Sequence, residues 1–225
     1  MKGPLAVTSQ KILVSDFDGT MTQHDFYQLT VESLLPPGTP DYWIDYRAGA
    51  ITHFEALRHY FAAIRATEDD VLKVVARMQL DPGLGAAVRS LRAAGWDVVV
   101  TSAGCAWYID RLLSEAGVTV EVFANPGRFK TGEGLLMEMP KDSPFRSPML
   151  GVDKTKIVQT LLNEGRCVAF AGDGFPDVEP ARLVPDDLRF ARGDLAKVFQ
   201  KEGLPFQRYQ RWSEIATTLV SRKQP

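Results

Sequence analysis

Two aspartates, Asp16 and Asp18, follow directly on a short apolar run at residues 11–15 (KILVS). Such a run is typical of a strand buried in a parallel sheet. In open α/β sheets, ligands bind beyond the carboxyl ends of the strands, so these carboxylates stand where a binding site forms. They can turn to the same side of the chain, and two close negative charges resist joint ionisation unless a cation lies nearby. Taken alone, the segment 16–20 (DFDGT) also fits an acidic turn after a strand.

Strands and helices alternate along most of the chain, which indicates the α/β class. After the first strand, apolar runs predict further strands at 96–101, 118–123, 167–171 and 188–190. Helical periodicity and helix-ending residues predict helices at 83–94, 105–116, 153–164, 177–183, 193–202 and 212–220. The segment 125–149 is rich in Gly and Pro, which predicts a hairpin and a loop. The alternation predicts a doubly wound, mostly parallel, Rossmann-like sheet.

Residues 22–80 differ from the rest because they contain helical patterns and no strand. Helices are predicted at 25–35, 42–47, 52–65 and 67–78, and the third has apolar or aromatic residues at helical spacing, Phe54, Leu57, Phe61 and Ile64. We therefore expect a small all-helical cap at 22–80, inserted into a catalytic core made of 1–21 and 81–225.

The composition is that of an ordinary globular protein. The chain has 225 residues, a formal net charge of −2 and 45% hydrophobic residues. No basic balance favours nucleic acid, no apolar run is long enough to span a membrane, and residues 1–10 have no signal-type apolar core. We expect a cytoplasmic protein without a nucleic-acid or membrane partner, and the sequence leaves its oligomeric state open. Cys105 and Cys167 are expected to be reduced, and a helix N-terminus at Cys105 favours its thiolate.

Four short pieces fall at predicted strand or helix ends where one pocket would lie. They are the aspartate pair with Thr20, the turn Ser102-Ala103-Gly104, Lys154, and the pair Asp173 and Asp177. Each alone has a simpler interpretation, since Ser102 fits a helix cap, Lys154 a surface lysine and Asp173 a tight turn. Together they suit a metal-dependent phosphate site, because carboxylates favour Mg²⁺ while lysine, hydroxyl and backbone N–H groups favour phosphate oxygens.

This set resembles the signature of the haloacid dehalogenase superfamily, and the resemblance covers essentially the whole chain. The helical insertion is similar to the C1-type cap of the subgroup that includes phosphoserine phosphatase. The run 172–181 and residues 190–192 are similar to the methionine-salvage phosphatase that acts on 2-hydroxy-3-keto-5-methylthiopentenyl-1-phosphate. That family can carry a cysteine-rich stretch just before the lysine, whereas this chain has 143–148 (SPFRSP) there.

The resemblance implies a Mg²⁺-dependent phosphatase for a small phosphorylated metabolite, possessing a keto-pentenyl or sugar-like skeleton and passing through an aspartyl-phosphate. It implies that Asp16 is the nucleophile and that Asp18 transfers the proton. It implies metal binding by Asp16, Asp173 and the backbone carbonyl of Asp18. Phosphate would be bound by Ser102, Ala103, Gly104 and Lys154, with Thr20 and Asp177 in supporting positions.

The cap is expected to supply the substrate contacts, with His24, Asp25, Tyr27, Arg47 and Arg58 as candidates. In phosphoserine phosphatases the cap carries an arginine for the substrate carboxylate. By resemblance of the segment 54–61, Tyr60 stands at that position here, although a shifted register would offer Arg58 instead. Tyrosine cannot form a bidentate ion pair, which predicts poor activity on phosphoserine and better activity on phosphates with an uncharged remainder.

Other functions fit part of this pattern. A phosphotransferase or mutase on the same fold would pass the phosphoryl group to an acceptor other than water. A non-enzymatic phosphoacceptor domain also pairs aspartates, a hydroxyl and a lysine on a doubly wound sheet, but it would lack a carboxylate equivalent to Asp18 and a helical cap. A dehalogenase would need neither Asp18 nor the metal carboxylates, so their presence argues against that activity.

Overall fold

A six-stranded sheet in the order β10-β9-β8-β1-β2-β3 forms the centre of the protein, and all its strands are parallel. The computed structural model describes residues 8–222. The strands are β1 (Lys11–Ser15), β2 (Trp96–Cys105), β3 (Glu121–Asn125), β8 (Cys167–Gly172), β9 (Arg189–Ala191) and β10 (Gln207–Arg208). The predicted doubly wound α/β class is therefore confirmed. The predicted core segments 1–7 and 223–225 lie outside the described residues.

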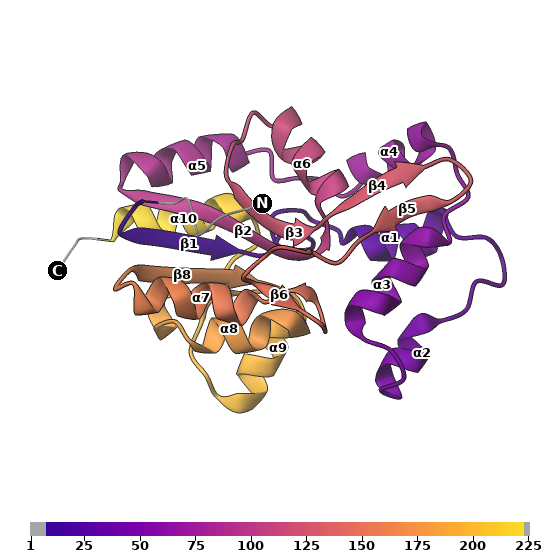
Figure 1. Ribbon diagram of the computed structural model, residues 1–225. Helices are drawn as coiled ribbons and strands as arrows, with labels where there is room; N and C mark the ends of the chain where they lie inside the picture. Colours follow the sequence, from indigo (N-terminus) through magenta and orange to yellow (C-terminus); the bar gives the residue numbers. More distant parts are fainter. Residues whose placement is uncertain (1–7, 223–225) are drawn as a thin grey trace.

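Helices cover both faces of this sheet, as Figure 1 shows. On one face lie α5 (Leu84–Ala93), α6 (Ala106–Glu115) and α10 (Trp212–Ser221), and on the other lie α7 (Lys154–Asn163), α8 (Val178–Arg182) and α9 (Gly193–Glu202). Alternate side chains of β1 point to opposite faces, so Leu13 packs with the first set while Ile12 and Val14 pack with the second. A strand with both faces covered must be apolar throughout, which explains the run at 11–15.

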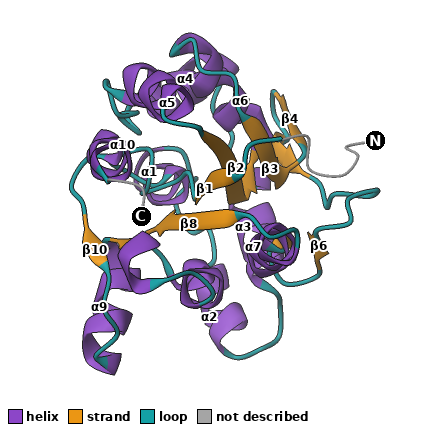
Figure 2. Ribbon diagram, turned by 90° about the vertical axis from the view of Figure 1, so that its left-hand side faces the viewer, coloured by secondary structure: helices purple, strands orange, loops and turns teal. Residues whose placement is uncertain are grey.

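The segment after β1 forms the helices α1 (Phe26–Ser33), α2 (Tyr42–Arg47), α3 (His53–Ala62) and α4 (Glu68–Ala76). Each begins at a side-chain N-cap, Asp25, Asp41, Thr52 or Thr67, which satisfies free backbone N–H groups of the first turn. The two ends of the segment lie side by side, because Thr22 and Leu80 form an antiparallel bridge. Both linkers therefore leave the core at one place, beyond the carboxyl end of β1. Figure 2 views the protein from the opposite end and shows helices on both sides of the sheet.

A hairpin of β4 (Gly127–Lys130) and β5 (Gly134–Met137) packs on α3, although it belongs to the chain after β3. Figure 1 shows it extending over the cap helices. The approach is close at Gly134, where a Cβ atom would collide with the carbonyl of Phe61. The predicted hairpin in 125–149 is confirmed. The division into core and cap at 22–80 stays a prediction, and we propose that the hairpin belongs with the cap.

The remaining elements are short. They are β6 (Arg146–Ser147), β7 (Gly151–Val152) and the 3-10 helices η1 (Phe175–Asp177) and η2 (Asp186–Leu188). The strand predicted at 96–101 extends to Cys105, with a shift in its pairing to β3 between Thr101 and Cys105. β10 was not predicted, because two residues carry no strand periodicity.

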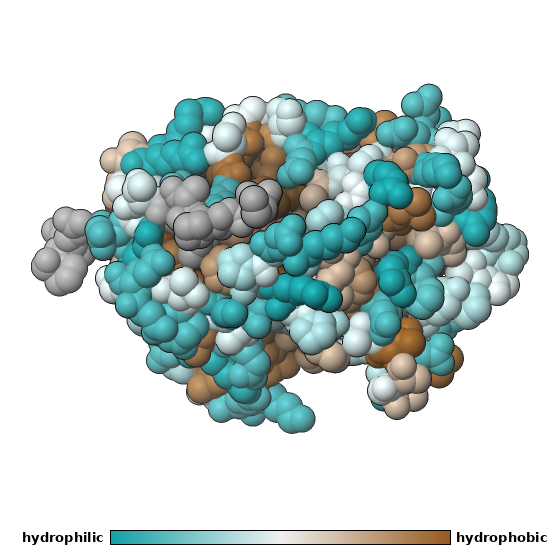
Figure 3. All heavy atoms as spheres, viewed as in Figure 1, coloured by the Kyte–Doolittle hydropathy of each residue, from teal (hydrophilic) through white to brown (hydrophobic). Residues whose placement is uncertain are grey.

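One face of the protein can be seen in Figure 3. Figure 3 shows hydrophobic atoms in small separate areas among hydrophilic ones on the face that it presents. No helix within residues 8–222 combines the length and the apolar character that crossing a membrane requires.

Candidate active site

A cavity of about 380 Å³ opens at the carboxyl ends of β1, β2 and β8, with the cap helices on its other side. The structure brings the predicted core residues together there. The cavity is lined by Asp16, Asp18, Ser102, Ala103, Gly104, Lys154, Asp173 and Asp177. Thr20 does not line the cavity. Its hydroxyl lies 3.2 Å from a carboxylate oxygen of Asp16 and 3.2 Å from one of Asp173.

Lys154 is buried at the start of α7 and holds two carboxylates. Its Nζ atom donates to Oδ1 of Asp16 at 2.6 Å and to Oδ1 of Asp177 at 2.7 Å. The side chains of Lys154, Asp16 and Asp177 are 3%, 8% and 1% exposed. A buried carboxylate needs such a partner, since an unpaired charge in this position would be very costly. The lysine therefore fixes where the Asp16 carboxylate points.

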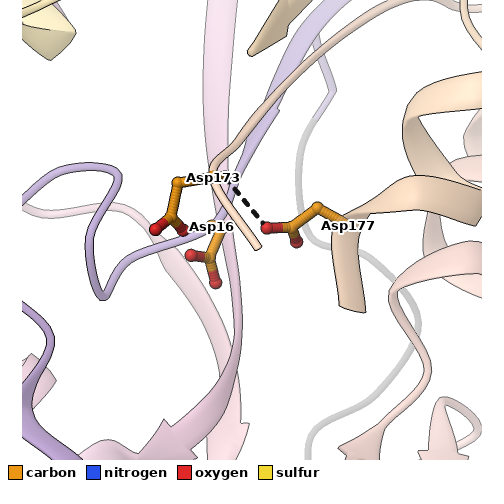
Figure 4. A group of neighbouring side chains, drawn as sticks. All are labelled: Asp16, Asp173 and Asp177. Atoms are coloured by element: carbon orange, nitrogen blue, oxygen red, sulfur yellow. Dashed lines mark hydrogen bonds between the residues drawn. The ribbon is translucent and has the colours of Figure 1, made fainter. Parts of the chain in front are cut away.

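Carboxylate oxygens of Asp16, Asp173 and Asp177 lie within 4.8 Å of one another, as Figure 4 shows for the three side chains. Oδ2 of Asp177 accepts from the backbone N–H groups of Asp173 and Gly174, both at 3.1 Å, and its Oδ1 accepts from Lys154. Both of its oxygens are thus engaged. The single O–H of Thr20 can donate to Asp16 or to Asp173 but not to both at once, so these two carboxylates keep lone pairs for a ligand. An all-oxygen donor set of this kind fits Mg²⁺.

Asp173 also requires a glycine opposite it. Gly19 has a φ of 67°, in the left-handed region that favours glycine. A Cβ atom there would collide with the Asp173 carboxylate. The turn after the first aspartate pair therefore has two reasons for glycine, its backbone conformation and the close approach of β8.

Asp18 turns away from the three-carboxylate cluster toward β2 and the cap. Its Oδ2 accepts from the hydroxyl of Tyr108 at 2.9 Å and from that of Ser102 at 3.3 Å. Its Oδ1 accepts from the backbone N–H of Phe26 at 3.2 Å, at the first residue of α1. Asp18 therefore connects the core to the cap, and its orientation is fixed by three donors.

The pKa values of Asp16, Asp18 and Asp173 are all raised. Burial, partly offset by Lys154, raises the pKa of Asp16 to about 6. Burial together with the charges of Asp25 and Asp16 raises the pKa of Asp18 well above its ordinary value. Burial likewise raises the pKa of Asp173, with the Asp16 charge adding to it. A site of this kind holds carboxylates that ionise with difficulty until a cation is bound.

Residues 102–104, predicted as a turn, form the last part of β2, and neighbouring residues hold this segment in place. The buried Asn125 side chain donates to the carbonyl of Ala103 at 2.7 Å and to that of Leu150 at 3.0 Å. The backbone N–H of Gly104 donates to the Ser102 hydroxyl at 2.9 Å. A Cβ atom at Gly104 would collide with the Tyr108 hydroxyl and approach the Asp18 carboxylate. Glycine therefore allows Asp18 and Tyr108 to meet.

The cap candidates divide into two groups. Asp25 and Tyr27 line the cavity. His24, Arg47 and Arg58 are exposed and lie outside the cavity lining, so the structure does not bring them to the site. Arg47 pairs instead with Asp41, at 3.6 Å, and Arg58 lies over the Phe54 ring.

Tyr60 also lies outside the cavity lining, because it is buried within the cap. Its hydroxyl donates to Asp41 at 2.7 Å.

Several cavity residues were missed in the sequence. His53, Leu57 and Phe61 of α3 line it together with Trp43 of α2. The spacing of four between 53, 57 and 61 places these side chains on one helix face, which is a signal that the sequence does contain. This face was not identified from the sequence, because the apolar stripe of the helix was counted from Phe54 instead of His53. Tyr108 also lines the cavity while it packs in the core, and its hydroxyl donates to Asp18.

The expectation that a helix N-terminus favours the Cys105 thiolate was wrong. The residue does precede a helix, but it is fully buried, and burial raises the pKa of its thiol to about 12. A thiol with that pKa stays protonated at neutral pH and is a poor target for oxidation.

The matches to curated relatives extend over nearly the whole chain or over about half of it. The 2-hydroxy-3-keto-5-methylthiopentenyl-1-phosphate phosphatase of Exiguobacterium sibiricum is 23% identical over 216 residues, which are 92% of this chain and 95% of the relative. The enzyme of the same name from Bacillus velezensis is 22% identical over 94% of this chain and 90% of the relative. A phosphoserine phosphatase from Polaromonas is 27% identical over 55% of this chain and 54% of its own length.

Solved structures show the same fold. A HAD family hydrolase from Salmonella enterica serovar Typhi matches 98% of this chain and 74% of its own, with a TM-score of 0.69 and 16% identity. A phospho-aspartyl intermediate analogue of phosphoserine phosphatase matches 93% of this chain and 99% of its own, with a TM-score of 0.63 and 16% identity. The haloacid dehalogenase-like hydrolase family model matches residues 13–181. The match spans most of the chain, so the protein belongs to the haloacid dehalogenase-like hydrolase family.

Proposed function

We propose that this protein is a Mg²⁺-dependent phosphatase that hydrolyses a small phosphorylated metabolite through an aspartyl-phosphate on Asp16. The observation that supports this most is the position of Asp16, at the end of the central strand between Lys154 and Asp173. The family membership and the curated phosphatases among its relatives agree with it.

The reaction would proceed in two steps, with Asp16 as the nucleophile and Asp18 as the proton donor and acceptor. An Asp16 carboxylate oxygen attacks phosphorus, and the bond from phosphorus to the substrate oxygen breaks. Asp18, whose raised pKa favours a protonated carboxyl, gives its proton to the leaving oxygen. In the second step water attacks phosphorus, Asp18 takes a proton from that water, and the bond to Asp16 breaks. The products are an alcohol and inorganic phosphate, and both aspartates return to their first state.

Lys154 and residues 102–104 at the end of β2 would stabilise charge on the phosphoryl oxygens. Lys154 already lies at the Asp16 carboxylate, so it stands beside the reacting phosphorus. Asp16 and Asp173 would hold Mg²⁺, which when bound supplies the positive charge that lets two anions approach each other. Asp177 would position Lys154 and the backbone of Asp173 through the contacts already described.

Phosphate release from p-nitrophenyl phosphate, with and without Mg²⁺, tests the proposal. We expect release that requires Mg²⁺ and is abolished by a chelator, because the carboxylate cluster repels the phosphate dianion when no cation is present. Undiminished release in the presence of chelator would contradict the metal assignment. A stable phosphoprotein that releases no phosphate would favour the phosphoacceptor alternative.

Mg²⁺ should also stabilise the fold, most strongly at high pH. The folded-state pKa values of Asp16, Asp18 and Asp173 are raised, so their contribution to stability is greatest at low pH and is lost as the pH rises through each folded-state pKa, which is about 6 for Asp16. Saturating Mg²⁺ should raise Tm by about 5 to 10 °C at pH 8 and by clearly less at pH 5. Thermal unfolding with Mg²⁺ and with chelator at both pH values measures this. An equal shift at the two pH values would contradict the assignment of these carboxylates.

The substrate is expected to carry no charge apart from its phosphate. Among the described residues, no arginine lines the cavity, and its one lysine, Lys154, already holds two carboxylates. A substrate carboxylate would therefore be buried without a partner, which costs several kcal/mol.

We expect kcat/KM for phosphoserine to be at least about 100-fold below that for a phosphate with an uncharged remainder. Steady-state kinetics on a panel of metabolite phosphates checks this. Phosphoserine as the best substrate of the panel would refute it.

A further inference from the structure

His53, the first residue of α3, places an imidazole in the lining of the cavity. It lines the cavity on the cap side, opposite the carboxylate cluster, and the neighbouring wall residues Trp43, Leu57 and Phe61 are largely apolar. None of the steps described above uses it. A polar side chain in such a wall is a candidate for orienting the part of the substrate that does not react.

The imidazole is held in one place. The Trp43 ring lies 5.1 Å from its centroid, and the Tyr46 ring lies 5.7 Å away at an interplanar angle of 85°. The helix start is itself tied to the core, because the backbone N–H of Phe54 donates to the carbonyl of Met149 at 2.8 Å. The ring can therefore present a fixed atom to a ligand.

The two ring nitrogens are not equivalent. Nδ1 is buried and has no hydrogen-bond partner among the described residues. The same does not hold for Nε2. A buried N–H without an acceptor is costly, so the proton belongs on Nε2. Burial, with a further contribution from the Lys154 charge, lowers the pKa of His53 to about 4, so the ring is neutral at physiological pH. It cannot serve as the counter-ion of a carboxylate.

We propose that Nε2 of His53 donates a hydrogen bond to an uncharged oxygen, a carbonyl or hydroxyl, on the non-phosphorylated part of the substrate. This inference rests on the proposed phosphatase function and narrows its substrate class. It makes His53 a specificity-determining residue, because a phosphate without such an oxygen leaves the imidazole N–H without an acceptor in the closed site.

Three phosphates of equal carbon number test the proposal. They are dihydroxyacetone phosphate, glycerol 1-phosphate and propyl phosphate, compared by kcat/KM, or by inhibition constants against p-nitrophenyl phosphate where turnover is slow. The wild-type protein should prefer the two oxygenated compounds over propyl phosphate by about 10-fold or more. His53→Phe should reduce that preference to about 2-fold or less.

Two further variants separate a hydrogen bond from a change of shape. The amide nitrogen of Gln reaches the position of Nε2, whereas that of Asn reaches the position of Nδ1. His53→Gln should therefore keep most of the preference and His53→Asn should lose it. His59→Phe, on the exposed side of the same helix, is the matched control and should keep the wild-type preference.

The outcomes separate a failure of the His53 inference from a failure of the proposed phosphatase function. If the wild-type protein hydrolyses p-nitrophenyl phosphate but His53→Phe, or His53→Gln and His53→Asn alike, keep the preference, the His53 inference fails and the phosphatase stands. If the wild-type protein hydrolyses no phosphate at all, the proposed function fails and the inference fails with it.

Discussion

Asp16→Asn is expected to abolish turnover while leaving the protein folded. A neutral amide cannot form the bond to phosphorus, so kcat should fall by about 10⁴-fold or more, as it does when other covalent enzymes lose their nucleophile. The fold should not suffer, because the ionised Asp16 carboxylate is disfavoured by burial and Lys154 keeps its bond to Asp177. Steady-state kinetics and thermal unfolding at pH 8 measure the two effects.

Trapping the phosphoprotein makes this test specific to the nucleophile. The p-nitrophenolate leaving group needs little protonation, so Asp18→Asn should still accept the phosphoryl group from p-nitrophenyl phosphate. It should release it slowly, because no base activates the water. Acid quenching and mass spectrometry should then find the phosphoryl group on Asp16 in Asp18→Asn and none in Asp16→Asn. Appreciable turnover by a well-folded Asp16→Asn protein would exclude Asp16 as the nucleophile.

The sequence predicted the core side of the site because strand ends are local features. An apolar run followed by a polar residue identifies a strand end, and in a parallel sheet all such ends meet at one edge. Asp16, Ser102 and Asp173 could therefore be placed together without a structure. The contact of Lys154 with Asp16 and Asp177 follows the same logic, since α7 begins at that edge.

The cap side could not be predicted equally well, because it depends on how separate helices pack. Position along a helix shows which residues share a face, but not which face meets the cavity. Arg58 and His53 both lie on α3, yet Arg58 is exposed over Phe54 while His53 lines the cavity. The hairpin at 127–137 was expected from its glycines, but its packing on α3 is a contact between segments about 70 residues apart.

Lys154→Met is expected to have the largest effect on stability. Removing the lysine leaves Asp16 and Asp177 buried without a cation, and breaking a buried ion pair from one side costs about 3 to 5 kcal/mol. The unpaired carboxylates can escape part of this cost by binding protons. The loss should therefore be larger at pH 8 than at pH 5, and saturating Mg²⁺ should restore part of it at pH 8. Denaturant unfolding at both pH values measures the effect.

Lys156→Met is the matched control, because Lys156 lies on the same helix with an exposed side chain and should change stability little. If the destabilisation comes from uncompensated charge, the double variant Asp16→Asn/Lys154→Met must lose less than the sum of the single variants, since it removes one of the two stranded carboxylates. A helix defect, or a cavity left by the lost side chain, would instead give additive losses. Additivity would thus show that the lysine acts through packing, whereas a shortfall from additivity of about 1 kcal/mol or more would identify Asp16 and Lys154 as an electrostatic pair.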